Sequence, residues 1–193
     1  MPTIFTHAVI GSAIAKLAAR DAVNPKTVTA CAVLAALPDV DGLFFGVIPY
    51  AHLFGHRGFT HSLLFAALCG LLTASLFAWH EWVTRAELWL YALLFARATV
   101  SHGILDAFTN GGLGVAFFAP FNTTRYFFPF HPIPVSPMTG GGLLTARGWR
   151  VISSELLMLW TFAAAVWLWD RHVIWRCGLA ACSLLLGLWA WLH

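Results

Sequence analysis

The sequence has 193 residues, of which 60% are hydrophobic and only 10% are charged, and its mean hydropathy is +0.77. About a quarter of the residues in a soluble domain are charged, so this composition excludes a soluble protein and predicts an integral membrane protein in contact with the lipid bilayer. The formal net charge of +3 is too small for a nucleic-acid-binding surface, and no nucleic-acid partner is expected.

The N-terminal part of the chain predicts a short helical hairpin. Residues 3–19 form the first predicted helix, and Asn24-Pro25 breaks the chain before a second helix over residues 27–37. This second helix is expected to stop at Pro38. Its eleven residues would rise only about 16 Å, which is less than the thickness of the hydrocarbon core. We therefore expect the hairpin to dip into the membrane or to lie against it.

Four later segments are apolar and close to the length of a membrane span: residues 62–79, 88–108, 156–169 and 173–192. Residues 110–150, between the second and third of them, are rich in proline, glycine and aromatic residues, which predicts a long packed loop. The predicted fold class is all-α, a polytopic membrane helical bundle with a short N-terminal helical hairpin and a long Pro/Gly/aromatic loop. The whole chain, residues 1–193, is expected to form a single domain.

Two pairs of polar residues border the first two of these spans. His56 and His61 stand in a polar turn just before the first span. His102 and Asp106 lie four residues apart near the end of the second span, so they share one face of the helix. Because the chain crosses the membrane and returns between the two pairs, both are expected at the same membrane face.

The hairpin adds further candidate ligands. Its antiparallel return is expected to bring Asp39 and Asp41 beside His7. Neutral imidazole nitrogens and carboxylate oxygens are suitable ligands for Zn²⁺ and similar divalent ions. Together the histidines and aspartates predict a divalent-metal site at one membrane face.

The same residues are also compatible with roles that need no divalent ion. His102 and Asp106 could form a buried hydrogen-bonded pair, and Asp39 and Asp41 could end a helix in a capped turn. Paired histidines in membrane spans could also hold a haem group. An intramembrane zinc protease is disfavoured because the sequence contains no His-Glu-x-x-His motif.

The motifs considered together are His7, Leu37-Pro38-Asp39-Val40-Asp41, Gly55-His56-Arg57-Gly58-Phe59-Thr60-His61-Ser62, Ser101-His102 through Asp106 and Thr109, and Arg125-Tyr126-Phe127-Phe128-Pro129. In this combination the chain resembles the YdjM-like inner-membrane metal-dependent hydrolases, over most of its length to about residue 155. That family looks distantly similar to zinc-dependent phospholipase C and to the zinc-dependent single-strand nucleases. The resemblance implies a helical, multi-pass protein of the bacterial inner membrane with a divalent-metal site.

The resemblance also implies a ligand set, which is His7, Asp39, Asp41, His56, His61, His102 and Asp106. The soluble phospholipases supply a further His and Glu four residues apart on a late helix, whereas this chain has Val151 and Glu155. We therefore expect Glu155 to be a lone late ligand of a cluster with fewer than three metal ions, zinc being the expected metal.

The expected function is that of a membrane-bound divalent-metal-dependent hydrolase acting on phosphoester or lipid-headgroup substrates. A metal-activated water would attack the substrate, and Asp39 or Asp41 would accept the proton. Arg57 is the expected substrate-binding residue, because a guanidinium group matches an oxyanion such as phosphate. The alternative is a non-catalytic membrane protein in which a structural or regulatory metal braces the helices.

Overall fold

A computed structural model describes residues 1–19, 24–80, 84–137, 140–168, 177–178, 180–185 and 187. Within this part of the chain the fold is a helical bundle without β-strands, as predicted. Four helical runs are long and apolar enough to cross a membrane: Pro25–Phe44, Leu63–His80, Arg85–Ala107 and Ala146–Trp167. The span predicted over residues 173–192 falls largely outside the described residues.

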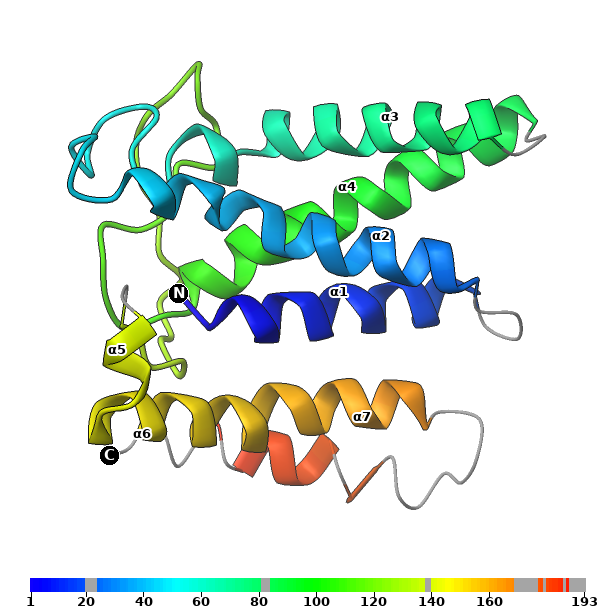
Figure 1. Ribbon diagram of the computed structural model, residues 1–193. Helices are drawn as coiled ribbons and strands as arrows, with labels where there is room; N and C mark the ends of the chain where they lie inside the picture. Colours follow the sequence, from blue (N-terminus) through cyan, green and yellow to red (C-terminus); the bar gives the residue numbers. More distant parts are fainter. Residues whose placement is uncertain are drawn as a thin grey trace.

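The N-terminal hairpin consists of α1 (Ile4–Ala19) and α2 (Pro25–Ala36), which run antiparallel and side by side (Figure 1). The Asn24 side chain caps α2 by accepting a hydrogen bond from the amide of Lys26. The two backbones approach closely at Gly11, where a methyl group would overlap the carbonyl oxygen of Cys31. This contact fixes the position of α1 along α2.

The second helical run of the hairpin is longer than predicted. After α2 the chain continues without a break into the 3₁₀ helix η1 (Leu37–Phe44). Pro38 lies in the first turn of η1, where the helix changes from α to 3₁₀, and the helical run continues past it. The prediction that this run ends at Pro38 and is too short to span was therefore wrong, since Pro25–Phe44 has 20 residues.

The predicted spans at 62–79 and 88–108 are confirmed as α3 (Leu63–His80) and α4 (Arg85–Ala107), a second antiparallel pair (Figure 1). A capping box opens α4. The Thr84 hydroxyl accepts a hydrogen bond from the amide of Glu87, and the Glu87 carboxylate accepts one from the amide of Thr84.

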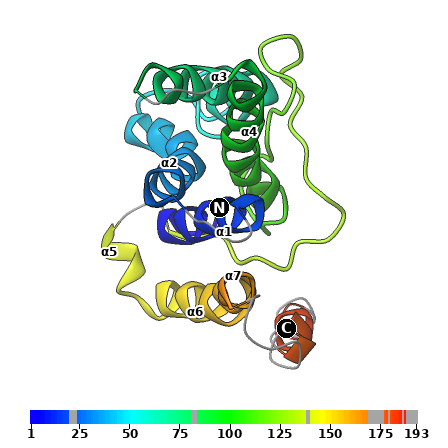
Figure 2. The same cartoon turned by 90° about the vertical axis from the view of Figure 1, so that its right-hand side faces the viewer.

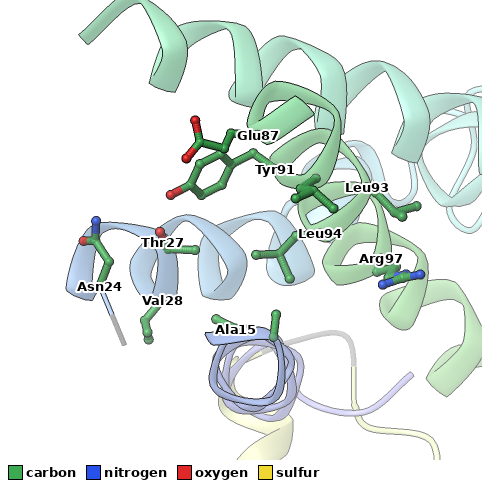
Figure 3. A pocket seen from close by; sticks show the side chains of 11 residues that line it. Ala15, Asn24, Thr27, Val28, Glu87, Tyr91, Leu93, Leu94 and Arg97 are labelled. Carbon is green, nitrogen blue, oxygen red and sulfur yellow. The ribbon is translucent and has the colours of Figure 1, made fainter. Parts of the chain in front are cut away.

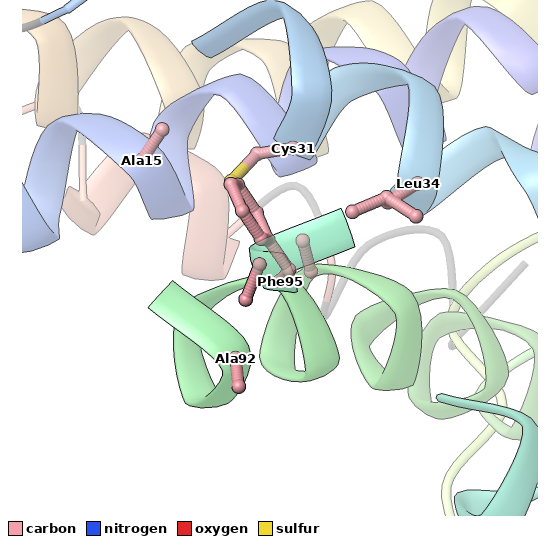
Figure 4. Close-up of a cluster of buried hydrophobic side chains, with 7 residues drawn as sticks. Ala15, Cys31, Leu34, Ala92 and Phe95 are labelled. Carbon is pink, nitrogen blue, oxygen red and sulfur yellow. The ribbon is translucent and has the colours of Figure 1, made fainter. Parts of the chain in front are cut away.

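Small side chains around one aromatic ring form the core between the first four helices. Figure 4 shows Phe95 of α4 surrounded by Cys31 and Leu34 of α2 and by Ala15 of α1. Phe95 and Cys31 are fully buried. Because small residues let helix backbones approach each other, this core holds α1, α2 and α4 close together along their length.

The third predicted span is also longer than expected. It is a continuous run of α6 (Ala146–Glu155), the π-helical turn η3 (Leu156–Trp160) and α7 (Thr161–Trp167). The prediction that it begins at residue 156 was wrong, because the Thr145 side chain accepts a hydrogen bond from the amide of Gly148 and starts the helix there. Figure 2 shows this run beside α1, on the side away from α3.

The long loop follows α4 in the chain and ends before the single-turn helix α5 (Gly140–Leu143). It packs over the first residue of α3 and the last residue of α4. The amide of Leu63 donates a hydrogen bond to the carbonyl of Phe117, and the amide of Phe128 donates one to the carbonyl of Ala107. The rings of Phe108 and Phe128 stack with their centroids 4.4 Å apart. At the same end of the bundle α1 begins and the run of α2 and η1 ends (Figure 1).

Candidate metal centre

Six side chains that can bind a metal ion meet at this end of the bundle. They come from the start of α1, from η1, from the turn before α3 and from the last turns of α4: His7, Asp39, His56, His61, His102 and Asp106. All six side chains are buried. Segments that are far apart in the sequence therefore contribute to one enclosed cluster.

The donor atoms are separated by the distances found within a coordination sphere. The Nε2 atoms of His61 and His102 are 3.0 Å apart, and Asp39 Oδ1 lies 3.2 Å from His102 Nε2 and 4.0 Å from His61 Nε2. Asp106 Oδ2 lies 3.5 Å from His61 Nε2. Two donor atoms on one tetrahedral zinc ion are about 3.3 Å apart, because each lies about 2 Å from the metal.

The six donors divide into two groups of three. His7, His102 and Asp106 form one group, and Asp39, His56 and His61 form the other, with the donor atoms of each group within 4.8 Å of one another. The groups adjoin through the 3.0 Å contact between His61 and His102. His7 also stacks on His102, with ring centroids 3.6 Å apart.

Three of these side chains have buried polar atoms without a hydrogen-bond partner among the described residues. They are both ring nitrogens of His7 and the carboxylate oxygens of Asp39 and of Asp106. Two of these oxygens do face a charged or polar nitrogen, since Asp106 Oδ2 lies 2.8 Å from Arg57 Nε and Asp39 Oδ1 lies 3.2 Å from His102 Nε2. A buried polar group left without a partner costs about 1–3 kcal/mol, and a charged one costs more. A cation bound here would give one ring nitrogen of His7 and the remaining carboxylate oxygens a partner, so the residues present fit a divalent ion.

Neighbouring groups orient the imidazoles toward the cluster. His102 Nδ1 donates a hydrogen bond to the carbonyl of Ala35 at 2.8 Å, which leaves Nε2 as the free donor atom for a metal. His56 Nδ1 lies 2.6 Å from Asp41 Oδ1, and His61 Nδ1 lies 3.2 Å from Asp41 Oδ2. In both histidines Nε2 is therefore the nitrogen left for a metal ion.

Asp41 lies beside the cluster rather than within it. Its Oδ2 accepts hydrogen bonds from the Thr60 hydroxyl at 2.6 Å and from the Arg57 amide at 3.1 Å, while Oδ1 is occupied by His56. Asp39, two residues earlier, has both oxygens free of hydrogen bonds. The two aspartates that the sequence presents as equivalent thus have different surroundings.

Arg57 is directed into the protein, and its side chain is almost completely buried. Its Nε lies 2.8 Å from Asp106 Oδ2, and its two terminal nitrogens donate to the carbonyl of Gly111 and to the Thr109 hydroxyl. Its φ angle of 61° is left-handed, a strained conformation for a residue with a side chain. The guanidinium expected to bind a substrate is therefore engaged with a carboxylate of the cluster.

The cluster carries an excess of negative charge, because the Arg57 guanidinium pairs with Asp106 alone, whereas the carboxylates of Asp39 and Asp41 contact histidines. His61 responds to this excess. Burial alone would lower its pKa, but the adjacent carboxylates of Asp106 and Asp41 outweigh burial and raise the pKa of His61 to about 9. The same field that favours an imidazolium would favour a bound cation.

Glu155, the remaining expected ligand, is engaged at the start of α1. Its Oε1 accepts a hydrogen bond from the amide of Thr3 at 2.7 Å, and its Oε2 accepts from the hydroxyls of Thr3 and Thr6 at 2.5 and 2.6 Å. The indole N–H of Trp160 also donates to the Thr6 hydroxyl. Glu155 thereby joins α6 to the first turn of α1, which carries His7.

Sequence reasoning gave no role to Arg125. Its guanidinium donates hydrogen bonds to the carbonyls of His56 and Tyr50, both at 2.8 Å, and lies over the Tyr50 ring. The long loop thus holds the turn that carries His56. A lone arginine within an aromatic stretch is the sequence signal that could have indicated this contact.

A cavity of about 490 Å³ lies between α1, α2 and α4, near the opposite end of the bundle (Figure 3). Its lining includes Asn24, Glu87, Tyr91 and Arg97 but no histidine. The cavity is therefore separate from the candidate metal ligands.

Long apolar helices around a buried His/Asp cluster define a polytopic helical membrane protein with a candidate metal centre. The chain belongs to the YdjM inner membrane protein family, whose model matches residues 1–190. It is 38% identical over 161 residues to Inner membrane protein YbcI of Escherichia coli (strain K12), which covers 83% of this chain and 91% of that protein. No solved structure matches the chain. The predicted multi-pass location in the inner membrane is thereby confirmed.

Proposed function

We propose that the chain is a membrane-embedded hydrolase that depends on a divalent metal ion, with zinc as the metal. The observation that carries this proposal is the two adjoining groups of three buried His and Asp donors, in which His7 and Asp39 have atoms without hydrogen-bond partners. These atoms lie beside His56, His61 and His102, whose Nε2 atoms are also available to a metal ion. A bound cation would offset the cost of burying all of them.

The donor chemistry favours a catalytic metal over a structural one. The two groups contain only imidazole and carboxylate donors. Structural zinc sites often use several cysteine ligands, whereas the catalytic sites of many hydrolases use histidines with a carboxylate. When bound, a divalent ion polarises a water molecule and lowers its pKa towards about 7.

The protein's own residues would have distinct roles in this reaction. His7, Asp39, His56, His61, His102 and Asp106 would hold the metal. The Asp39 oxygen not used as a ligand would accept a proton from water. Asp41 orients the rings of His56 and His61. Arg57 balances the charge of Asp106.

The proposed substrates are phosphoesters, including those of phospholipid headgroups. This choice rests on the resemblance of the His and Asp motifs to those of zinc-dependent phospholipase C and the single-strand nucleases.

A second candidate function is a structural metal that braces the helices. The burial of all six donor side chains favours it, because structural metal sites are closed to solvent. Under this alternative, removal of the metal would loosen the contacts among α1, η1 and α4, and no substrate would be hydrolysed.

The test combines metal analysis with activity on protein purified without chelators. The hydrolase proposal predicts at least about one divalent ion per chain and phosphoester hydrolysis that chelation abolishes and zinc restores. His102→Gln should lose both metal and activity. His131→Gln, a histidine outside the cluster, is the matched control and should keep both.

Two outcomes would reject this assignment. Metal that is retained without hydrolysis of any phosphoester, together with unfolding on chelation, would favour the structural brace. Less than about 0.2 ion per chain would contradict both candidates, because a site with three or more protein ligands retains its metal during gentle purification.

A further inference from the structure

Many large apolar side chains are exposed at the end of η1 and on the two loop segments around the candidate metal-binding end of the bundle. We call six of them the apolar collar: Leu43, Val47, Phe54, Phe118, Phe121 and Phe127. Phe121 is 86% exposed, and Leu43 and Val47 are each 79% exposed. An apolar surface of this kind is unfavourable in water and marks a site of interaction with another protein or with a membrane.

The two segments of the collar are bound to each other. The amide of Ala116 donates a hydrogen bond to the carbonyl of Arg57, and Arg125 donates to the carbonyls of Tyr50 and His56. Both segments lie beyond the same end of the helices in Figure 1. The collar is therefore part of one packed unit rather than two independent loops.

The collar lies at the level where two spanning helices end. The hydrogen bonds from Leu63 to Phe117 and from Phe128 to Ala107 attach the long loop to the first residue of α3 and the last residue of α4. On α3 the apolar surface continues through the exposed side chains of Leu63, Leu68 and Leu72. Aromatic side chains are enriched at this depth, where the hydrocarbon meets the headgroups.

The near absence of charged residues favours contact of the collar with lipid over contact with a second protein. Residues 43–54 and 113–127 contain a single charged residue, Arg125, and its guanidinium is taken up by backbone carbonyls. The collar thus presents no ionic group for pairing with a partner protein. It adjoins two helices that are long and apolar enough to cross a membrane, α3 and α4.

The other side of the same loop covers the metal-binding residues. Val115, Ala116 and Ala119 are buried beneath it. The Phe117 ring lies so close to Gly103 that a methyl group there would be 3.2 Å from it, and Gly103 is the residue next to His102. One loop therefore separates the cluster from the surface that carries Phe118 and Phe121.

From this arrangement we propose that the apolar collar is inserted into the interfacial layer of the bilayer, and that the site takes its substrate from that layer. The substrate is then a membrane lipid with a phosphoester headgroup rather than a water-soluble phosphoester. The insertion of the collar stands on the exposed side chains alone, whereas the choice of a lipid substrate rests on the proposed hydrolase function.

Insertion can be measured without any enzyme activity. Single-cysteine variants Val47→Cys and Phe121→Cys, on a background without the four native cysteines, are labelled with bimane and reconstituted into vesicles with brominated acyl chains. Leu72→Cys, halfway along α3, is the reference for a lipid-exposed position. The collar labels should be quenched by the lipid at least about half as strongly as the reference label, and only weakly by iodide. Strong quenching by iodide with none by the lipid would overturn the insertion.

The substrate is tested by comparing a phospholipid in vesicles with the soluble diester bis(4-nitrophenyl) phosphate. The double variant Val47→Ser and Phe121→Ser should hydrolyse the phospholipid about tenfold more slowly and the soluble diester at an unchanged rate. Leu144→Ser, equally exposed but outside the collar, is the matched control and should leave both rates unchanged.

Each result of the substrate test is decisive. A wild type that hydrolyses only the soluble diester, or a double variant whose two rates fall together or stay unchanged, overturns the lipid substrate. A wild type that hydrolyses neither compound overturns the hydrolase and with it the lipid substrate. The quenching result still decides the insertion in that case.

Discussion

Arg57 and Asp106 form a buried ion pair within the candidate metal-binding cluster, with 2.8 Å between Nε and Oδ2 and almost no exposure of either side chain. The pair joins the turn before α3 to the last turn of α4. Because both groups are removed from water, each depends on the other for compensation of its charge.

The first prediction concerns the stability of the metal-free protein. Arg57→Met leaves Asp106 charged and buried without its guanidinium partner, and should lower the free energy of unfolding by up to about 3–5 kcal/mol, the neighbouring His61 compensating part of the loss. The double variant Arg57→Met and Asp106→Leu removes both charges and should lose less than Arg57→Met alone. Denaturant unfolding in detergent measures the three proteins. Strictly additive losses would show that the two side chains are not coupled.

The second prediction tests Asp106 as a metal ligand. Asp106→Asn preserves the size of the side chain but removes the charge that offsets the cation, so metal content should fall while the protein still inserts into the membrane. Glu87→Gln changes a carboxylate at the other end of the same helix and should keep the metal. Elemental analysis of both variants gives the answer, and full occupancy in Asp106→Asn would remove this residue from the site.

A third prediction separates Asp39 from Asp41. Asp41→Asn disturbs the orientation of His56 and His61 and should weaken zinc binding about 10–100-fold without changing the number of ions bound at saturation. Asp39→Asn should instead reduce that number. Competition with a chromophoric chelator yields affinity and stoichiometry together. The reverse pattern would exchange the two roles.

A fourth prediction concerns pH. In the metal-free protein the pKa of His61 is raised to about 9, so this ring carries a proton at pH 7 and must lose it before Nε2 can bind a metal. Zinc affinity should therefore increase by about tenfold per pH unit from pH 7 to 9 and then level off. Titrations in buffers of different ionisation enthalpy would also detect the released proton. An affinity independent of pH over this range would disagree with the structure.

The fifth prediction addresses Glu155. Glu155→Gln keeps the shape of the side chain but weakens its three hydrogen bonds to Thr3 and Thr6, so thermal stability should fall by an amount equivalent to about 1–3 kcal/mol. Metal stoichiometry should stay at the wild-type value. A loss of metal at unchanged stability would instead make Glu155 a ligand.

The spans at 62–79 and 88–108 could be predicted because a uniform apolar composition over about 20 residues is characteristic of a helix that crosses a bilayer. The antiparallel return of the chain then correctly predicted that the candidate histidines and aspartates lie close together. The ends of helices were harder to predict. Pro38 can be accommodated in a 3₁₀ turn, and the polar residues around Arg147 and Arg150 concealed the start of α6.

The roles of individual polar residues depended on contacts that are distant in the sequence. Glu155 meets Thr3 across more than 150 positions, and nothing near either residue indicates the pairing. Arg57 points at Asp106 through a left-handed backbone angle that its residue type does not predict. Asp39 and Asp41 differ because the 3₁₀ turn of η1 directs them to different neighbours.

Gly11 lies one helical turn beyond His7 and has no functional group, yet the spacing of the cluster depends on it. Any side chain at this position would meet the backbone at Cys31 and the side chain of Ala35, whose carbonyl orients His102. Relief of that overlap would move α1 away from α2, and a shift large enough to remove the overlap would take the His7 ring out of reach of a shared metal ion. All six donors would remain in the sequence, but His7 would stand too far from the other five. The spacing of the six donors thus depends on the absence of a side chain at Gly11.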